Sequence, residues 1–337
     1  MDLNSGFWHF PLTEKAKKLT AFAFEDLTFQ CTRMPQGLKI SSAVMQRKMR
    51  KFIIQHGLMG TSVYVDNIIL QAPTVELYKQ RLSMLFQACL QDGLKLRNRK
   101  SHHFINNTFN LFGFEICLRT HTIKPEREKV DKIQELAVPT TKKRIRTFVG
   151  AVSYFQSMLP VLQKDLAPLH ELAAPNTKFK WTEECNAPFI KIKKDLAKLP
   201  LVYIFQPNLQ IHFFCDAAMT SHIAYCLYQY HAIKQVLVPI KFNSHKLSPS
   251  EKKFSQFEVE ALALIFAILK EENLLSFGNS ILYTDARILT FITRFATATS
   301  KISRWGILLK SFNVQVQFLP DTNALIKVWK NLNLKIG

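Results

Sequence analysis

The sequence lacks any apolar run long enough to cross a membrane. Its longest run, Ala261 to Leu269, is far shorter than the roughly 20 residues that a membrane-spanning helix needs. The first residues, Met1 to Ser5, have neither the basic segment nor the apolar core of a signal peptide. We therefore expect no membrane partner and an intracellular protein, in the cytoplasm or the nucleus.

The sequence also lacks closely spaced cysteine pairs, and it has no excess of acidic residues. The six cysteines show no CxxC and no Cys/His zinc spacing, which favours reduced thiols over a disulfide framework or a zinc site. The adjacent His102 and His103 have no partners at ligand spacing and indicate a solvated loop. Acids number 25 against 45 Lys and Arg, so the net charge is +20. An excess that large favours a polyanionic partner, with nucleic acid the first candidate over solubility alone.

The 337 residues predict two or three domains without an internal repeat, and the 47% hydrophobic content suffices for buried cores. Apolar periodicity and turn residues predict the elements of the first third. These are a hairpin over 19–33 around Glu25-Asp26, a helix from Ser41 through Ile53, a hairpin over 61–70, a helix over Val75–Gln91 ended by Gly93, and a strand pair over 110–116.

The middle of the chain is basic and helical. Two helices are predicted on either side of Pro139-Thr140-Thr141, with Thr141 as the cap of the second. Their cations are Lys124, Arg127, Lys129, Lys132, Lys142, Lys143, Arg144 and Arg146. Such faces suit a phosphate backbone, although each cation alone is more simply a solvated side chain. Residues 174–208 look like a connecting segment around a helix that holds Trp181 and Phe189.

The last third predicts a second α/β unit. Strands are expected over Gln210–Asp216, Ile223–Gln229, Val236–Phe242, Ser280–Asp285 and Asn313–Phe318. Ser255 and Glu258 form a capping box that opens an apolar helix over Val259–Leu269.

Three carboxylates of this last third are expected to converge. Asp216 and Asp285 each follow a predicted strand, and Glu260 lies one turn into the helix between them. Three such acids can hold two divalent cations across a phosphodiester, although any one of them could equally be a cap or a solvated acid. We assign the cap to Glu258 and the metal to Glu260, because Glu260 directly precedes the sheet-facing apolar run.

In the first third, Asp66-Asn67 sits at the turn of the 61–70 hairpin. Asp and Asn are common in ordinary turns, so this pair alone predicts only a turn. Asp2 is its expected partner, because nucleotide polymerisation needs two metal-binding carboxylates from neighbouring strands and an aromatic floor beneath the incoming sugar.

The order of several motifs resembles the reverse transcriptases of Ty3/gypsy long-terminal-repeat retrotransposons and their retroviral relatives. In the polymerase part the matching segments are Asp2 to Thr13, Met34-Pro-Gln-Gly-Leu to Ala43, Tyr64-Val65-Asp66-Asn67 for the Tyr-x-Asp-Asp box, Gly93 to Lys100, and Leu111-Phe-Gly113. Further on they are Ile123-Lys-Pro, the run to Phe148-Val-Gly150, Phe179 to Cys185, Cys215-Asp216-Ala217, Phe254 to Leu262 and Tyr283-Thr-Asp-Ala286. The resemblance covers almost the whole chain.

The resemblance implies an α+β and α/β multidomain protein from a Pol polyprotein. It implies a reverse-transcriptase palm with the fingers largely missing, a helical thumb and connection, and a ribonuclease H-like mixed-sheet domain. The expected bounds are 1–118 for the N-terminally truncated palm, 119–173 for the thumb-like module, 174–208 for the connection and 209–330 for the ribonuclease H-like domain.

The resemblance also implies roles for individual residues. The implied catalytic and metal-binding residues are Asp2, Asp66, Asp216, Glu260 and Asp285, with two Mg²⁺ ions per active site and Mn²⁺ as an alternative. The implied substrate-binding residues are Phe7 as the steric gate against the ribose 2′-OH, Gln36 and Gly37 near template and nucleotide, Tyr64, and Lys100. The implied partners are an RNA template, a DNA primer, an RNA/DNA hybrid and dNTPs.

Four departures from the family pattern bear on activity. Asn67 replaces the second aspartate and removes a negative charge beside the metals. Basic fingers residues are expected to be missing. Lys327 stands where a fourth carboxylate would lie, so we expect ribonuclease H activity to be weak. The glycine-rich turn after the first acid is Thr220-Ser221-His222 here.

Two functions follow as hypotheses. The first is an RNA-directed DNA polymerase with ribonuclease H that uses two-metal phosphoryl-transfer chemistry. The alternative is a catalytically impaired retrotransposon relic that only binds nucleic acid. A host-adopted binding protein is a weaker third reading.

Overall fold

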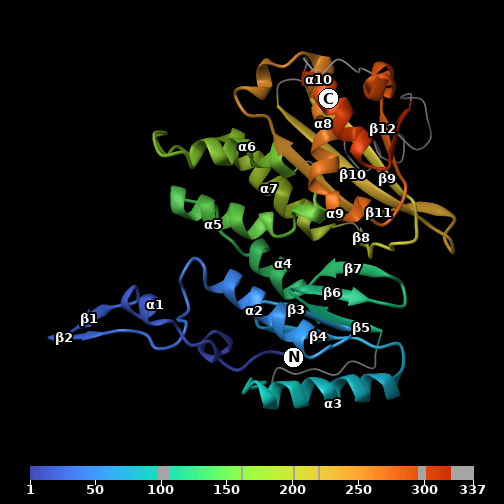
Figure 1. Cartoon of the computed structure of the whole chain (residues 1–337). Helices are drawn as coiled ribbons and strands as arrows, with labels where there is room; N and C mark the ends of the chain where they lie inside the picture. Colours follow the sequence, from blue (N-terminus) through green and yellow to red (C-terminus); the bar gives the residue numbers. More distant parts are fainter. Residues whose placement is uncertain (98–106, 161, 200–201, 219–220, 295–300, 320–337) are drawn as a thin grey trace. The chain divides into compact units, whose positions relative to one another are not determined.

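The computed structural model describes residues 1–97, 107–160, 162–199, 202–218, 221–294 and 301–319. The chain forms two compact units, residues 1–105 and 106–337 (Figure 1). Lys100, the pair His102-His103, Thr220 and Lys327 lie outside the described residues. No helix within the described residues is long and apolar enough to cross a membrane.

The first unit packs two long helices against a short hairpin. Its elements are η1 (Gly6–His9), α1 (Glu14–Lys18), the β1–β2 hairpin (Phe22–Phe24 and Leu27–Phe29), α2 (Ser41–Gln55), the β3–β4 hairpin (Thr61–Tyr64 and Asn67–Leu70) and α3 (Val75–Gln91). The buried side chains of Met45, Met49, Ile68 and Leu85 form the centre of its core. Both predicted hairpins and both long helices are confirmed, and Gly93 has a φ of 67° just after α3.

The second unit begins with a four-stranded sheet in the order β5-β6-β7-β8. Its strands are β5 (Thr108–Leu111), β6 (Phe114–Cys117), β7 (Thr122–Pro125) and β8 (Val202–Tyr203). Between β7 and β8 the chain forms α4 (Arg127–Gln134), α5 (Lys142–Ser153), η3 (Gln156–Met158), α6 (Leu162–Leu172) and α7 (Glu183–Ala197). These helices share a core that includes Phe148, Leu166 and Phe189.

Two features of this helical region differ from expectation. Trp181 lies before α7 rather than in it, because the helix begins at Glu183, although its ring packs edge-on against Phe189 at 5.8 Å. Thr141 caps α5 as predicted. However, two cations of α5 bind carbonyl groups at the end of α6: Lys142 Nζ donates to Ala174 O (2.6 Å) and Arg146 Nη2 to Ala173 O (3.0 Å). These two cations therefore neutralise a helix C-terminus.

The rest of the second unit is built on a five-stranded mixed sheet in the order β11-β10-β9-β12-β13. The strands are β9 (Ile211–Ala218), β10 (His222–His231), β11 (Val236–Lys246), β12 (Ser280–Thr284) and β13 (Val314–Phe318). The other elements are η4 (Glu251–Lys253), α8 (Gln256–Lys270), α9 (Glu272–Leu275), η5 (Arg287–Arg294) and α10 (Lys301–Ser311). The apolar helix α8 packs on β9 and β10 and buries its side chains against theirs.

The predicted strands are confirmed, and three of them are longer than expected: β9 ends at Ala218, β10 at His231 and β11 at Lys246. Strand β9 continues two residues past Asp216, so this acid lies within the strand instead of ending it. All six cysteines lie in the described part of the chain and are free thiols, as expected.

Candidate active sites

The first carboxylate site is assembled by backbone hydrogen bonds beside the β3–β4 hairpin. Ile68 N–H donates to Met1 O (2.8 Å), Leu3 N–H to Asp66 O (3.0 Å) and Arg97 N–H to Asp2 O (2.8 Å). Asp2 thus forms a β-bridge opposite Asn67. The structure places Asp2 and Asp66 on neighbouring extended segments, as the sequence predicted.

The side chains at this site form a mixed polar cluster. Asn67 Nδ2 lies 3.4 Å from Asp66 Oδ1, so the amide points a donor at the carboxylate. Arg97 Nη1 lies 4.0 Å from Asp2 Oδ2. A carboxylate at position 67 would add a third anion here, whereas the amide adds a hydrogen-bond donor. The site therefore has less negative charge for a cation than three acids would supply.

The turn of the hairpin is held by a residue that the sequence reasoning did not assign. Val65 has a φ of 55°, an uncommon conformation for a β-branched residue. Gln46 of α2 accepts a hydrogen bond from Val65 N–H (2.7 Å) and donates to Val63 O (3.0 Å). Because both bonds go to the turn backbone, Gln46 fixes the orientation of Asp66. No pattern in the sequence pointed to this role.

Four residues predicted to bind substrate lie in the described part of the first unit. Phe7 lies in η1 and packs half-buried against the core of the first unit. Gln36 and Gly37 lie in the exposed turn before α2, where Gly37 has a φ of 90°. Tyr64 ends β3 with an exposed side chain. Their roles stay predictions.

The second carboxylate site lies on the five-stranded sheet and α8. Strands β9 and β12 are parallel, with Phe214 opposite Tyr283. Asp216 and Asp285 each follow two residues later, so they lie at the same level of adjacent strands. Glu260 is 8% exposed in α8. Burial, and then the charges of Asp285 and Asp216, raise the pKa of Glu260 to about 8.

This pKa shift shows that the three acids lie within electrostatic reach of one another. Their oxygen donors suit a hard divalent cation such as Mg²⁺. Within the described residues, however, no three His, Cys, Asp or Glu side chains are close enough to form a ready-made metal cluster. Asp216 Oδ1 instead accepts a hydrogen bond from Ala217 N–H (2.8 Å). The three carboxylates are therefore suitable ligands for Mg²⁺. To bind the ion together, their side chains must rotate toward one another.

Glu258 has the separate role that the sequence assigned to it. Ser255 and Glu258 form the predicted capping box at the start of α8. The other carboxylate oxygen of Glu258 accepts from Lys301 Nζ of α10 (3.0 Å). Glu258 therefore anchors the first turn of the helix that carries Glu260.

His222 is a further residue that the sequence reasoning did not single out beyond its place in the turn. It opens β10, is fully buried, and its Nδ1 lies 2.7 Å from Ser221 Oγ. Among the described residues its Nε2 has no hydrogen-bond partner. Burial, with a smaller effect of Lys164, lowers its pKa to about 4. A neutral imidazole therefore occupies the strand next to the one that carries Asp216.

Two family models match parts of this chain. Residues 1–116 match the reverse transcriptase (RNA-dependent DNA polymerase) family. Residues 181–281 match the RNase H-like domain found in reverse transcriptase. The chain is therefore similar to reverse transcriptases that carry an RNase H-like domain. These are enzyme families whose members use divalent metal ions.

Similar curated proteins are longer polyproteins. The chain is 26% identical over 321 residues to the retrovirus-related Pol polyprotein from transposon 412 of Drosophila melanogaster, covering 95% of the chain and 25% of that protein. It is 27% identical over 341 residues to the enzymatic polyprotein of cauliflower mosaic virus (strain D/H), covering 96% of the chain and 48% of that protein. The chain thus spans about a quarter to a half of the length of these relatives.

Solved structures share the fold. A foamy viral protease-reverse transcriptase in complex with RNA/DNA hybrid aligns with a TM-score of 0.78 and 23% identity, over 96% of this chain and 44% of that one. The same enzyme in complex with dsDNA aligns with a TM-score of 0.73 and 23% identity, over 96% of this chain and 67% of that one. The expected reverse-transcriptase fold with a ribonuclease H-like sheet is confirmed.

Proposed function

We propose that this chain is an RNA-directed DNA polymerase with an RNA/DNA-hybrid ribonuclease H activity. In this proposal Asp2 and Asp66 bind the divalent ions for nucleotide addition, and Asp216, Glu260 and Asp285 bind those for hybrid cleavage. Mg²⁺ is the proposed ion. The RNA template, DNA primer, hybrid and dNTPs are the proposed substrates, in line with the nucleic acids in the similar foamy viral structures.

The observation that carries the proposal is the electrostatic coupling of Glu260 to two aspartates on adjacent strands. Three carboxylates in a partly buried place are unfavourable without a cation: burial first, and then the charges of Asp285 and Asp216, raise the pKa of Glu260. Two cations there can activate a water and stabilise the leaving oxygen of a phosphodiester. The net charge of +20 supports a nucleic-acid substrate.

The residues of this chain supply the rest of the chemistry in the proposal. Gln46 orients the hairpin that carries Asp66 through its two bonds to the turn backbone. Phe7 excludes the ribose 2′-OH, and Tyr64, Gln36, Gly37 and Lys100 contact template, primer and nucleotide. The four-part division at 118, 173 and 208 is part of the same proposal.

The test is a pair of assays on the full chain with Mg²⁺: primer extension on an RNA template, and cleavage of an RNA/DNA hybrid. Asp66→Asn should abolish extension and leave cleavage, whereas Asp216→Asn should abolish cleavage and leave extension. Each variant is the control for the other. Absence of both activities in the parent chain, with nucleic-acid binding intact, would instead support the impaired relic.

A further inference from the structure

A polar hollow lies in the second unit, where the helical region meets the edge strand of the five-stranded sheet. Its volume is about 340 Å³, toward the lower end of the roughly 300–1,000 Å³ typical of small-ligand sites. The lining residues come from η3, α6, β11 and α8: Gln156, Gln163, Asn243, Ser244, His245, Lys246, Phe266 and Lys270.

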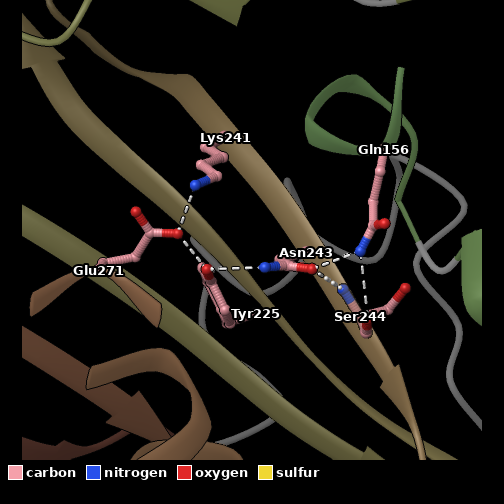
Figure 2. A network of polar contacts seen from close by, with 6 residues as sticks. All are labelled: Gln156, Tyr225, Lys241, Asn243, Ser244 and Glu271. Atoms are coloured by element: carbon pink, nitrogen blue, oxygen red, sulfur yellow. Dashed lines mark hydrogen bonds and ion pairs between the residues drawn. The ribbon is translucent and has the colours of Figure 1, made fainter. Parts of the chain in front are cut away.

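Two carboxamides that line the hollow, Gln156 and Asn243, belong to a network of polar contacts (Figure 2). Gln156 Nε2 donates to Asn243 Oδ1 (2.7 Å), and Asn243 Nδ2 donates to Tyr225 Oη (3.1 Å). Tyr225 in turn donates to the buried Glu271, which also pairs with Lys241 at 2.7 Å. Because the network fixes these side chains, a ligand in the hollow would not have to order them.

The charge of the hollow has a single sign. Its ionisable lining residues are His245, Lys246 and Lys270, and no acid is among the residues that line it. Two of these residues have acid partners outside the lining: Lys246 pairs with Glu171 at 2.8 Å, and His245 Nε2 lies 3.3 Å from Glu251 Oε2. Pairs near the surface are weak, and Lys270 is exposed. Lys270 Nζ lies 5.9 Å from the centre of the Phe266 ring. The hollow therefore suits an anion.

One wall of the hollow is aromatic. The rings of His245 and Phe266 lie 5.4 Å apart at 35°. An aromatic ring beside cations is the combination on which nucleic-acid bases stack while their phosphates are neutralised. The carboxamides nearby offer the donor and acceptor pairs that contact base edges.

The hollow lies at the same level of the sheet as the second carboxylate site. Asp216 of β9 is opposite Ala224 of β10, which is opposite Ser244 of β11. Two strand spacings, roughly 10 Å, therefore separate the backbones of Asp216 and Ser244. A nucleic-acid strand that passes Asp216 can reach the hollow within a few nucleotides.

We infer that this hollow binds one nucleotide unit of a nucleic-acid strand, with Phe266 and His245 beside the base and Lys270 and Lys246 at the phosphate. The inference rests on the proposed function, because it takes the substrate of that function as the ligand. A free nucleoside monophosphate has the same chemistry and is the other source to distinguish.

The test is equilibrium binding by the full chain with EDTA present, so that binding is measured without catalysis. The probes are a labelled RNA/DNA hybrid, the single RNA strand and adenosine monophosphate. Lys270→Gln should reduce the slope of log affinity against log salt for the strands by about 0.7–0.9, the value for one lost phosphate contact. Phe266→Leu should weaken strand binding by about fivefold or more at unchanged slope.

Lys310→Gln is the matched control, because Lys310 is an exposed lysine of the same unit that does not line the hollow. An unchanged slope in Lys270→Gln, or an equal change in Lys310→Gln, overturns the inference. Binding of adenosine monophosphate that depends on Lys270, without any effect on the strands, overturns the strand as ligand. Thermal unfolding confirms that each variant is folded.

Failure of the proposed function is a separate result. If extension and cleavage are absent but the slope still falls in Lys270→Gln, the hollow binds nucleic acid without that chemistry. If both activities are present and the slope is unchanged, only the hollow is excluded. A parent chain that binds none of the probes overturns the inference directly.

Discussion

The two carboxylate sites gather their acids by different means. Beside the β3–β4 hairpin, the backbone bonds of residues 1–3 hold Asp2 next to Asp66, and the neighbouring side chains of Asn67 and Arg97 are hydrogen-bond donors. On the five-stranded sheet, Asp216, Asp285 and the buried Glu260 repel one another, which contributes to the raised pKa of Glu260. At the first site, hydrogen-bond donors offset the negative charge of the acids. At the second site, a cation is needed to offset that charge.

This difference predicts at which of the two sites a bound metal ion should stabilise the folded protein more. A cation that binds only the folded state stabilises it by mass action. The gain should be larger where carboxylates are held together against their repulsion, which is the site around Glu260. The first site should bind its ions more weakly, because Asn67 supplies an amide in place of a third carboxylate.

The largest expected effect separates the two glutamates of α8. Glu260→Gln should reduce hybrid cleavage by at least about 100-fold, because metal-held charge stabilisation contributes several kcal/mol to such reactions. It should also remove most of the rise in unfolding temperature that Mg²⁺ gives. Cleavage kinetics and a Mg²⁺ titration of thermal unfolding measure both.

Glu258→Gln is the matched control for that prediction. It removes the charge from the capping box and from the pair with Lys301, so it should lower the free energy of unfolding by about 1 kcal/mol. Cleavage per folded molecule should persist. Equal loss of cleavage in both variants would contradict the division of roles between Glu258 and Glu260.

The next effect concerns the charge missing from the hairpin. Asn67→Asp should lower the Mg²⁺ concentration for half-maximal primer extension by at least about tenfold, because a unit charge about 4 Å from a divalent ion contributes roughly 2 kcal/mol even at the dielectric constant of water. Extension rates across a Mg²⁺ series measure it. Gln71→Glu adds the same charge just after β4, away from the turn, and should leave the requirement unchanged. An unchanged requirement in Asn67→Asp would show that Asn67 does not limit ion binding.

A third effect tests how the hairpin is held. Gln46→Ala removes both side-chain bonds to the turn backbone and should destabilise it locally by about 1–3 kcal/mol. Hydrogen exchange of the β3–β4 amides should then speed up, and extension should fall. Gln87→Ala, at an exposed position of α3, is the control and should change neither. Unchanged exchange in Gln46→Ala would exclude Gln46 as the residue that orients Asp66.

Local patterns in the sequence were sufficient to predict much of the fold. The hairpin around Asp66, the helix stop at Gly93 and the capping box at Ser255 each depend on neighbours within a few residues, and each is present. The hairpin's turn is one residue earlier than predicted, at Val65-Asp66, because Asn67 pairs with Tyr64. The convergence of Asp216 and Asp285 followed from strand order, because parallel strands end at one edge of a sheet.

Contacts between distant segments were not accessible in the same way. Lys142 and Arg146 belong to a basic run that suggested phosphate binding, yet they bind carbonyl groups about 30 residues away at the end of α6. Gln46 reaches the hairpin across 17 to 19 residues. The burial of His222 depends on strands on both of its sides. No local periodicity reports such partners, so these roles came only from the structure.

The last effect, which should leave both activities unchanged at neutral pH, uses His222 to probe the sheet that carries Asp216. Because the folded protein lowers the pKa of His222 from 6.5 to about 4, the folded state binds fewer protons than the unfolded state between these values. The stability that the neutral ring contributes is present above pH 6.5 and is lost as the pH falls toward 4. His222→Gln removes this titration, so its unfolding free energy relative to the parent should rise on the order of 1–3 kcal/mol from pH 7 to pH 4.5. The difference in unfolding free energy between the variant and the parent cancels the effects of other titrating groups. One of these groups is Glu260, whose titration changes stability with pH in the opposite direction. A difference that stays constant with pH would show that His222 is charged or accessible in the folded protein, and that this strand is less tightly packed than the first site's hairpin.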